Sequence, residues 1–305
     1  MAISRVHEPV LVDEVLGHLA PASGETILDL TVGAGGHAER VLGTLGPEGR
    51  LIGCDRDPAI LRVAREVLAP YGARAILRAC RSDSFRAMLQ ELGVPAVHGV
   101  LMDLGVSSLQ LDEAARGFSF RASGPLDMRM TPGDGLTARE LIQRTAEPDL
   151  ARIFFRYGEE PQARRIAHAL KALPRNGVPK TTGELAEFIA ELAPARQLGR
   201  APIHPATRVF QALRIAVNDE LGVLERTLPL ATEALHAGGR MVVISFHSLE
   251  DRIVKDWFRA QHREGVFAHV AKKPEVASEA EVQRNPRARS AKLRFAVKAD
   301  LERAA

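Results

Sequence analysis

The sequence DLTVGAGGHAERVL, residues 29–42, decides the fold of this chain. It continues an apolar run that begins at Thr26, and it leads into a helical pattern that extends to Leu45. This order indicates a strand, a loop and a helix. Gly33, Gly35 and Gly36 occupy the loop, where the missing side chains allow the backbone to approach a ligand closely.

Apolar runs and helical patterns alternate along the rest of the first hundred residues. A helical pattern at Ala59–Leu68, for example, separates two apolar runs. This alternation predicts a parallel sheet and a Rossmann-like α/β fold. Beyond the first strand, the predicted strands are Leu51–Asp55, Arg74–Ala79, Val97–Leu104, Gly239–Ser245 and Lys292–Lys298.

More than a hundred residues separate the fourth and fifth predicted strands, and they show little strand character. Helical patterns in this interval cover Ala138–Gln143, Asp149–Phe155, Glu159–Leu173, Thr182–Leu192 and Pro205–Leu228. An inserted helical domain is the simplest explanation. Because the last pattern leads directly to the fifth strand, we assign residues 1–107 and 205–305 to the core and residues 108–204 to the insert.

The glycine loop alone leaves the cofactor open. Its glycines and Ala38 satisfy the dinucleotide pattern G-x-G-x-x-A, and Asp55 follows at the spacing expected for NAD. Two further acids favour S-adenosylmethionine, since Asp29 lies within the first strand and Asp103 at the tip of the fourth. That cofactor is cationic, whereas carboxylates repel a pyrophosphate. Any one of these acids alone is more often a cap of the next helix, but three at strand ends can converge on one ligand.

The composition predicts a cytosolic globular protein. With 305 residues, 46% of them hydrophobic, the chain can bury a full core. No stretch approaches the ~18 apolar residues of a membrane helix, and the N-terminal residues lack a signal-peptide pattern. The two cysteines, Cys54 and Cys80, are expected to be reduced, and the histidines show no paired ligand spacing, so no metal site is predicted.

The net charge of +3 is unevenly distributed along the chain. Residues 252–305 contain 13 Lys+Arg against 7 Asp+Glu. A basic segment on a near-neutral body suits a polyanionic partner such as a nucleic acid. From charge alone, a merely solvated segment is an equal alternative.

Four longer strings carry a resemblance to a known family. They are HEPVLVDEVL (residues 7–16), DLGVSSLQLDEAARGFSF (103–120), GPLDMRM (124–130) and ISFHSLEDRIVK (244–255). These strings strongly resemble the ribosomal RNA small subunit methyltransferase H family, also called MraW, over nearly the whole chain. The resemblance implies a class I S-adenosylmethionine-dependent methyltransferase with an inserted all-helical domain. Members methylate the N4 amine of a decoding-centre cytosine, so it also implies 16S rRNA within the small ribosomal subunit as the partner.

The resemblance also implies which residues contact the cofactor. They are Gly35, Gly36, His37, Asp55, Asp103, Gln110 and an aromatic residue after the third strand. Phe85 matches the aromatic, although residues 81–84 depart from the usual context of the family and a core position is the alternative. Asp29 and Gly33 complete the predicted cofactor set.

Asp103 is the main candidate to hold the cytosine amine, a poor nucleophile that needs a hydrogen-bond acceptor. Many amino methyltransferases have Pro-Pro-aromatic after this acid, but here Leu-Gly-Val follows. The stacking partner of the base must therefore come from elsewhere, and the candidates are Phe118, Phe120 and Phe246. An ordinary core position is an equal alternative for each, and the favoured one for Phe118. Ser245 and His247, at the tip of the fifth strand, are candidates to line the base pocket.

Two further groups are expected to contact the RNA substrate. Asp127 and Arg129 lie in a loop that is predicted to close over it, and Arg287 and Arg289 belong to a basic run that offers phosphate contacts. Surface solvation is the alternative for the arginines. Ser248, with an acid three residues on, also resembles a helix start.

The rival functions are a methyltransferase with another substrate, a nicotinamide-dependent oxidoreductase and an RNA-binding assembly factor without catalysis. The sequence leaves open whether the chain forms a homodimer.

Overall fold

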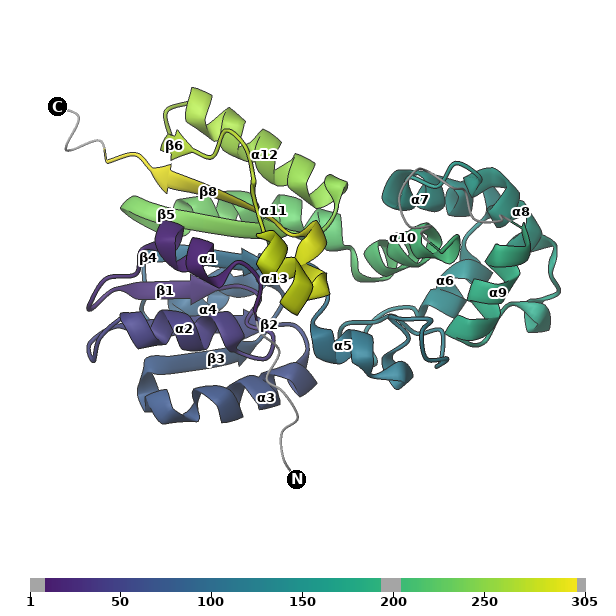
Figure 1. Cartoon of the computed structure of the whole chain (residues 1–305), viewed down its shortest axis with the longest axis horizontal. Helices are drawn as coiled ribbons and strands as arrows, with labels where there is room; N and C mark the ends of the chain where they lie inside the picture. The colour runs from purple at the N-terminus through teal and green to yellow at the C-terminus, as the bar shows by residue number, and fades with distance from the viewer. Residues whose placement is uncertain (1–8, 193–203, 301–305) are drawn as a thin grey trace. The chain divides into compact units, whose positions relative to one another are not determined.

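The computed structural model describes residues 9–192 and 204–300. Contacts divide the chain into two compact units (Figure 1). The first, here called the sheet unit, comprises Met1–Gly105 and Leu221–Ala305. The second, the helical unit, comprises Val106–Glu220.

The sheet unit contains one eight-stranded sheet with the order β3-β2-β1-β4-β5-β8-β6, in which β7 also pairs with β8. The first five strands in this order are parallel, and β8 is antiparallel to β5. The strands are β1 (Thr26–Asp29), β2 (Arg50–Asp55), β3 (Ala75–Ala79), β4 (Val97–Asp103), β5 (Leu235–Ser245), β6 (Phe267–Val270), β7 (Glu275–Val276) and β8 (Lys292–Lys298).

Helices cover both faces of this sheet, as Figure 1 shows. They are α1 (Val12–Leu19), α2 (Gly36–Thr44), α3 (Pro58–Leu68), α4 (Phe85–Glu91), α11 (Glu220–Ala234), α12 (Ser248–Arg263) and α13 (Glu279–Arg284). Strand residues alternate between the two faces. On β4, Val100 and Met102 pack with α4, α11 and α12, whereas Leu101 packs with α1, α2 and α3. The strand β4 is therefore buried on both sides, as expected of a central strand in a parallel sheet.

The predicted strands of the sheet are confirmed, with ends that differ from the observed ones by at most four residues. The strands β6 and β7 were not predicted, because they are only 4 and 2 residues long. Cys54 and Cys80 are free thiols. Among the residues with described positions, no helix has the length and apolar character needed to span a membrane.

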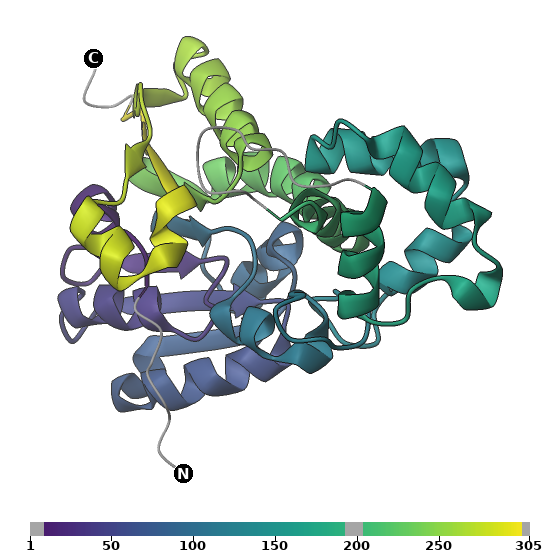
Figure 2. The same cartoon turned by 45° about the vertical axis from the view of Figure 1, so that its right-hand side comes forward.

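The helical unit has its own apolar core. Its helices are α5 (Ser108–Asp112), α6 (Ala138–Arg144), α7 (Glu147–Gly158), α8 (Ala163–Ala172), α9 (Thr182–Leu192) and α10 (Ala206–Asn218), most of which can be followed in Figure 2. Phe154 of α7, Ile166 of α8 and Leu213 of α10 are fully buried in this core. Gly158 permits the close approach of α7 to α10, since a Cβ there would lie 2.4 Å from the carbonyl oxygen of Arg208.

The predicted end of the insert at residue 204 is wrong, because α10 belongs to the helical unit. The apolar side of α10 packs into the helical core, and the buried Asn218 ties its end to the loop at Met128 and Met130 through hydrogen bonds of 2.8 Å. The single helix predicted at Pro205–Leu228 is two helices. Asp219 breaks it with a left-handed φ of 51°, a conformation that Asp and Asn tolerate better than most residues. Residues 193–203, just before the predicted boundary, lie outside the described part of the chain.

Candidate cofactor and active site

Three acids end neighbouring strands at one edge of the sheet. Asp29 is the last residue of β1, Asp55 of β2 and Asp103 of β4. The strand β1 lies between the other two, with Asp29 in register with Gly53 on one side and Leu101 on the other. The sequence prediction that these carboxylates converge is therefore confirmed, while their contact with a cofactor stays a prediction.

The glycine loop after β1 is held by the acid at the end of β2. Gly33 donates its backbone N–H to Oδ2 of Asp55 at 2.9 Å. Gly33 and Gly35 have φ values of 55° and 92°, in the left-handed region that favours glycine. A Cβ at Gly35 would lie 3.4 Å from the Cα of Ala64 in α3, so the loop and the start of α2 pack closely on that helix.

Thr31 joins the acids of β1 and β4. Its backbone N–H donates to Oδ1 of Asp29 at 3.0 Å, and its hydroxyl oxygen accepts the backbone N–H of Asp103 at 2.5 Å. These two bonds fix the ends of the two strands to each other. The relative position of the two carboxyl groups is thus set by a residue that the sequence analysis did not single out.

His37 lies in the first turn of α2 and is buried. Its Nε2 atom is 2.8 Å from the carbonyl oxygen of Val10, and its Nδ1 atom is 3.5 Å from Oδ2 of Asp103. His37 therefore links the segment before α1 to the acid of β4. Val10 belongs to the string at residues 7–16, and its contact with His37 brings that string to the site. Residues 7 and 8 lie outside the described part of the chain.

Burial disfavours the charged form of each acid. It raises the pKa of Asp29 to about 7, with a smaller rise from the nearby Asp103 and Asp55. Burial raises the pKa of Asp103 to about 7, with a further contribution from the charge of Glu250. Burial also raises the pKa of Asp55 to about 6, although the backbone N–H groups of Asp57 and Gly33 oppose the shift. The pKa of His37 is lowered by burial.

These residues fit the chemistry of S-adenosylmethionine. Oδ2 of Asp29 and Oδ1 of Asp103 are buried and have no hydrogen-bond partner among the described residues. Buried acceptors of this kind are costly unless a donor or a cation reaches them. Three carboxylates around one loop suit a ligand with an ammonium and a sulfonium, and they would repel a pyrophosphate.

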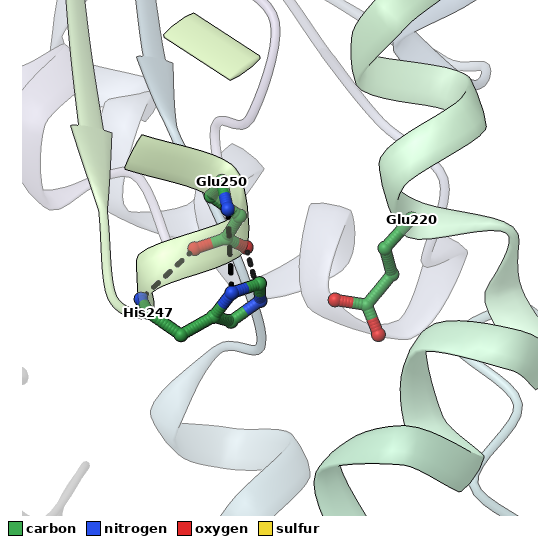
Figure 3. A group of neighbouring side chains, drawn as sticks. All are labelled: Glu220, His247 and Glu250. Carbon is green, nitrogen blue, oxygen red and sulfur yellow. Dashed lines mark hydrogen bonds and ion pairs between the residues drawn. The ribbon is translucent and has the colours of Figure 1, made fainter. Parts of the chain in front are cut away.

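The end of β5 leads into a capped helix (Figure 3). His247 is the N-cap of α12, and its Nδ1 accepts the backbone N–H of Glu250 at 3.3 Å. Glu250 is 2% exposed, and its Oε2 accepts the backbone N–H groups of Phe246 and His247 at 2.8 and 3.3 Å. The cap is therefore His247, one residue before the Ser248 that the sequence suggested.

Two other side chains at this end have packing roles. Ser245 is buried, and its hydroxyl donates to the carbonyl oxygen of Lys292 at 3.3 Å. Phe246 is half-buried and packs against the core on the α1 face, near Gly105. Glu220, also drawn in Figure 3, belongs to the helical unit, where it forms a two-point ion pair with Arg214.

Phe85 is fully buried in the core beneath α4, which is the alternative that the sequence left open. In the helical unit, Gln110 forms a capping box with Ser107 at the start of α5. Phe120 packs in the helical core, where its ring lies 4.8 Å from that of Phe210. Roles of these residues in binding stay predictions.

The remaining predicted residues are polar. Asp127 and Arg129 pair with each other through two bonds of 2.8 and 2.7 Å. The 3-10 helix η5 (Pro286–Ser290) carries Arg287, which is half-buried, and Arg289, which is exposed. Asp127 and Arg129 belong to the helical unit, whereas η5 packs with α13 and β7 in the sheet unit. Contact of these four residues with RNA stays a prediction.

Sequence reasoning missed three contributors, namely Thr31, Val10 and Glu250. Val10 acts through its backbone, so its side chain gives no signal. Thr31 follows Asp29 by two residues, a spacing that suits a turn closed by the acid. Glu250 stands three residues after His247, the spacing of a capping box, but histidine is an uncommon cap.

A sheet with five parallel strands in the order 3-2-1-4-5, a glycine loop after β1 and acids at the ends of β1, β2 and β4 define a class I S-adenosylmethionine-dependent methyltransferase. The profile of the MraW methylase family matches residues 4–299. The chain belongs to this family.

Relatives at close to half identity support the assignment. Ribosomal RNA small subunit methyltransferase H of Heliobacterium modesticaldum is 48% identical, over 96% of this chain and 98% of its own length. The protein of the same name from Anaeromyxobacter sp. (strain K) is 49% identical, over 94% and 96%. That of Nitratidesulfovibrio vulgaris (strain DSM 19637 / Miyazaki F) is 47% identical, over 95% and 85%. The oxidoreductase alternative is therefore set aside.

Proposed function

We propose that this enzyme methylates the N4 amine of a decoding-centre cytosine, number 1402 in the usual bacterial numbering, in the 16S rRNA of the small ribosomal subunit. The names of its relatives support a small-subunit ribosomal RNA as the substrate. The observation that carries the proposal is Asp103, whose buried Oδ1 lacks a partner at the strand end beside Asp29. Because the small subunit is a cytoplasmic particle, we place the enzyme in the cytoplasm.

In this proposal Asp29, Asp55 and Asp103 hold the cofactor around the glycine loop. When bound, S-adenosylmethionine supplies an electrophilic methyl carbon on a positively charged sulfur. Asp55 is oriented by the N–H groups of Gly33 and Asp57, both at 2.9 Å, and keeps lone pairs for hydroxyl donors. Asp29 offers its unpartnered Oδ2 to a cationic or N–H donor of the cofactor, and Asp103 lies beside it with its unpartnered Oδ1 kept for the substrate amine.

The cytosine amine needs an acceptor, because its lone pair is delocalised into the ring. Asp103 accepts one of its hydrogens and orients the nitrogen. Ser245 donates its hydroxyl hydrogen to Lys292, which leaves the oxygen as a second acceptor at the end of the neighbouring strand β5. Phe246 and Phe120 are the candidates to stack on the base.

The polar residues outside the sheet edge are assigned to RNA binding. Arg287 and Arg289 contact phosphates, and the loop of Asp127 and Arg129 closes over the substrate. The internal pairing of Asp127 with Arg129 holds that loop in shape and leaves the guanidinium partly exposed. Phosphate contacts of this kind make binding weaker at higher salt.

The test is a transfer assay with a labelled methyl group and small ribosomal subunits from cells that lack the gene. The enzyme is expected to label one cytosine, and nuclease digestion should release N4-methylcytidine. Label on another base or at another ring position would contradict the proposal. Calorimetry against NAD serves as the control for cofactor choice, and no heat of binding is expected.

A further inference from the structure

His37 and Asp103 form a pair whose hydrogen-bond roles are fixed by a third group. A carbonyl oxygen only accepts, so Nε2 of His37, 2.8 Å from the carbonyl oxygen of Val10, must carry the hydrogen of that bond. In the neutral ring, Nδ1 is then an acceptor. It faces Oδ2 of Asp103 at 3.5 Å, and an ionised carboxylate is also only an acceptor. One proton placed between Nδ1 of His37 and Oδ2 of Asp103 would give these two acceptors a shared hydrogen bond.

The surroundings allow this pair to gain and lose one proton near neutral pH, so that Asp103 can be ionised when the amine reacts. His37 is 6% exposed, and burial lowers its pKa, although the nearby carboxylates of Asp29 and Glu281 oppose that shift. The pKa of Asp103 is raised to about 7 by burial and by the charge of Glu250. The two groups meet at the 3.5 Å contact between Nδ1 and Oδ2, and a proton shared there would make them titrate as a pair.

We propose that His37 and Asp103 act as one proton-holding pair, in which Asp103 takes the proton released by the acceptor amine and Nδ1 of His37 then accepts a hydrogen bond from the resulting carboxylic acid. This inference rests on the proposed function, because it assigns a proton acceptor for methylation of an amine. His37 thus has a role beyond the cofactor contact that the resemblance implies.

The step balances in atoms and charge. The amine nitrogen forms a bond to the methyl carbon, and the electron pair of the broken carbon–sulfur bond stays on sulfur, which becomes neutral. The nitrogen then releases one proton to Oδ1 of Asp103, the oxygen that has no partner among the described residues. A half-turn of the carboxyl group about its Cβ–Cγ bond, a torsion with two equivalent positions, brings the proton to face Nδ1.

The geometry gives each oxygen of Asp103 a separate task. Oδ2 is the oxygen next to Nδ1 of His37, and Oδ1 is left for the amine. The backbone of Asp103 is held by the hydroxyl of Thr31 at 2.5 Å, and the ring of His37 is held by Val10 at 2.8 Å. Neither group has to move its backbone to exchange the proton.

The first test needs no substrate and no activity. Nitrogen chemical shifts of the His37 ring are recorded across pH 5–9 in the cofactor-free full chain and in Asp103→Asn. In the native protein, the Nδ1 shift is expected to follow a transition near pH 7, the pKa of Asp103. That transition should disappear from His37 in Asp103→Asn, while the nitrogen shifts of the exposed His269 should be the same in both proteins. The same pH curve for His37 in both proteins would overturn the proposal.

The second test separates this proposal from the proposed function. His37→Gln keeps an N–H donor for Val10 but has no titratable acceptor. With small ribosomal subunits and saturating cofactor, its single-turnover rate at pH 7 should fall at least about tenfold and its pH profile should shift, while the cofactor Kd is measured separately. His269→Gln is the matched control and should keep the native rate.

The outcomes are distinct. If the native enzyme does not methylate the subunit, the proposed function fails, whereas the chemical-shift test still decides whether the pair shares a proton. If the native enzyme is active and His37→Gln keeps its full rate at every pH, the proton-holding pair is overturned and the proposed function stands. A loss in His37→Gln that saturating cofactor restores would also overturn it.

Discussion

The backbone N–H of Gly33 donates to Oδ2 of Asp55 at 2.9 Å, so the acid at the end of β2 shapes the loop that follows β1. The other oxygen of Asp55 accepts the backbone N–H of Asp57, also at 2.9 Å. One carboxylate thereby fixes the loop and the start of α3. The lone pairs of Asp55 that these two N–H groups do not use are available to accept hydrogen bonds from a cofactor. Their direction is fixed by the same two bonds.

Replacing this acid should therefore damage cofactor binding in two ways. Asp55→Ala removes the acceptor for Gly33 and an acceptor for the cofactor, and we expect a loss of about 10- to 100-fold in affinity for S-adenosylmethionine. Asp55→Asn should lose less, because its amide oxygen can still accept from Gly33. Calorimetry measures both, with the exposed Asp256→Ala as control. Native affinity in Asp55→Ala would show that Asp55 only orders the turn before α3.

Cofactor affinity should depend on pH. In the cofactor-free protein, the pKa is about 7 for Asp29 and Asp103 and about 6 for Asp55. These groups must therefore lose their protons before they can hold a cation. Lowering the pH from 7.5 to 6 should weaken binding at least about tenfold. Calorimetry at pH 6.5 in buffers of different ionisation heat should detect proton release. Equal affinity at both pH values would contradict the raised pKa values.

The same burial predicts how the cofactor-free protein responds to pH. The pKa of Asp29 is 3.8 for an ordinary Asp and about 7 in the fold, so the fold prefers the protonated form. Its stabilising contribution is full below pH 4 and is lost as the pH rises to about 7. Asp29→Asn imitates the protonated acid and keeps an oxygen for Thr31.

Asp29→Asn should therefore melt higher than the native protein without cofactor, by at least about 2 °C at pH 8 and by less at pH 5. Asp256→Asn, an exposed change on α12, should leave the Tm unaltered at both pH values. With saturating cofactor the order should reverse at pH 8, because only the native protein is stabilised by binding. A lower Tm for cofactor-free Asp29→Asn at pH 8 would mean that burial of the ionised Asp29 carboxylate does not destabilise the fold.

The strand ends were predictable because their signals are local. Apolar runs that end in Asp29, Asp55 and Asp103 reveal both the parallel sheet and the edge where the acids meet. The glycine loop was equally visible, since three glycines separate a strand from a helix. Contacts made by backbone atoms could not be predicted from the sequence. Examples are the carbonyl oxygen of Val10, which meets His37, and the N–H of Asp103, which donates to Thr31.

The boundary of the helical unit was missed for a physical reason. The helical pattern runs from Pro205 to Leu228, and its one glycine, Gly222, lies three residues after the break, so the sequence shows no end at Asp219 itself. The break depends on a left-handed Asp219 and on hydrogen bonds from Asn218 to a loop ninety residues earlier. Such long-range bonds leave no periodic signal.

Asn218 should be essential to the stability of the helical unit. Its amide donates to the carbonyl oxygens of Met128 and Arg214 at 2.8 and 2.9 Å, and it accepts the N–H of Met130 at 2.8 Å. Asn218→Ala leaves these buried groups unpaired and should cost about 1–3 kcal/mol. Amide hydrogen exchange should accelerate in residues 106–220. The exposed Asn176→Ala is the control, and equal protection in both variants would contradict this role.

The central claim is that Asp103 holds a cytosine amine of small-subunit ribosomal RNA for methylation. The direct measurement is mass mapping of that RNA from cells that lack the gene, complemented with the native gene or with Asp103→Asn. We predict that the native gene restores a methyl group on N4 of one decoding-centre cytosine, and that Asp103→Asn, although folded, leaves it unmethylated. Identical maps with and without the gene, or full methylation by Asp103→Asn, would contradict the account.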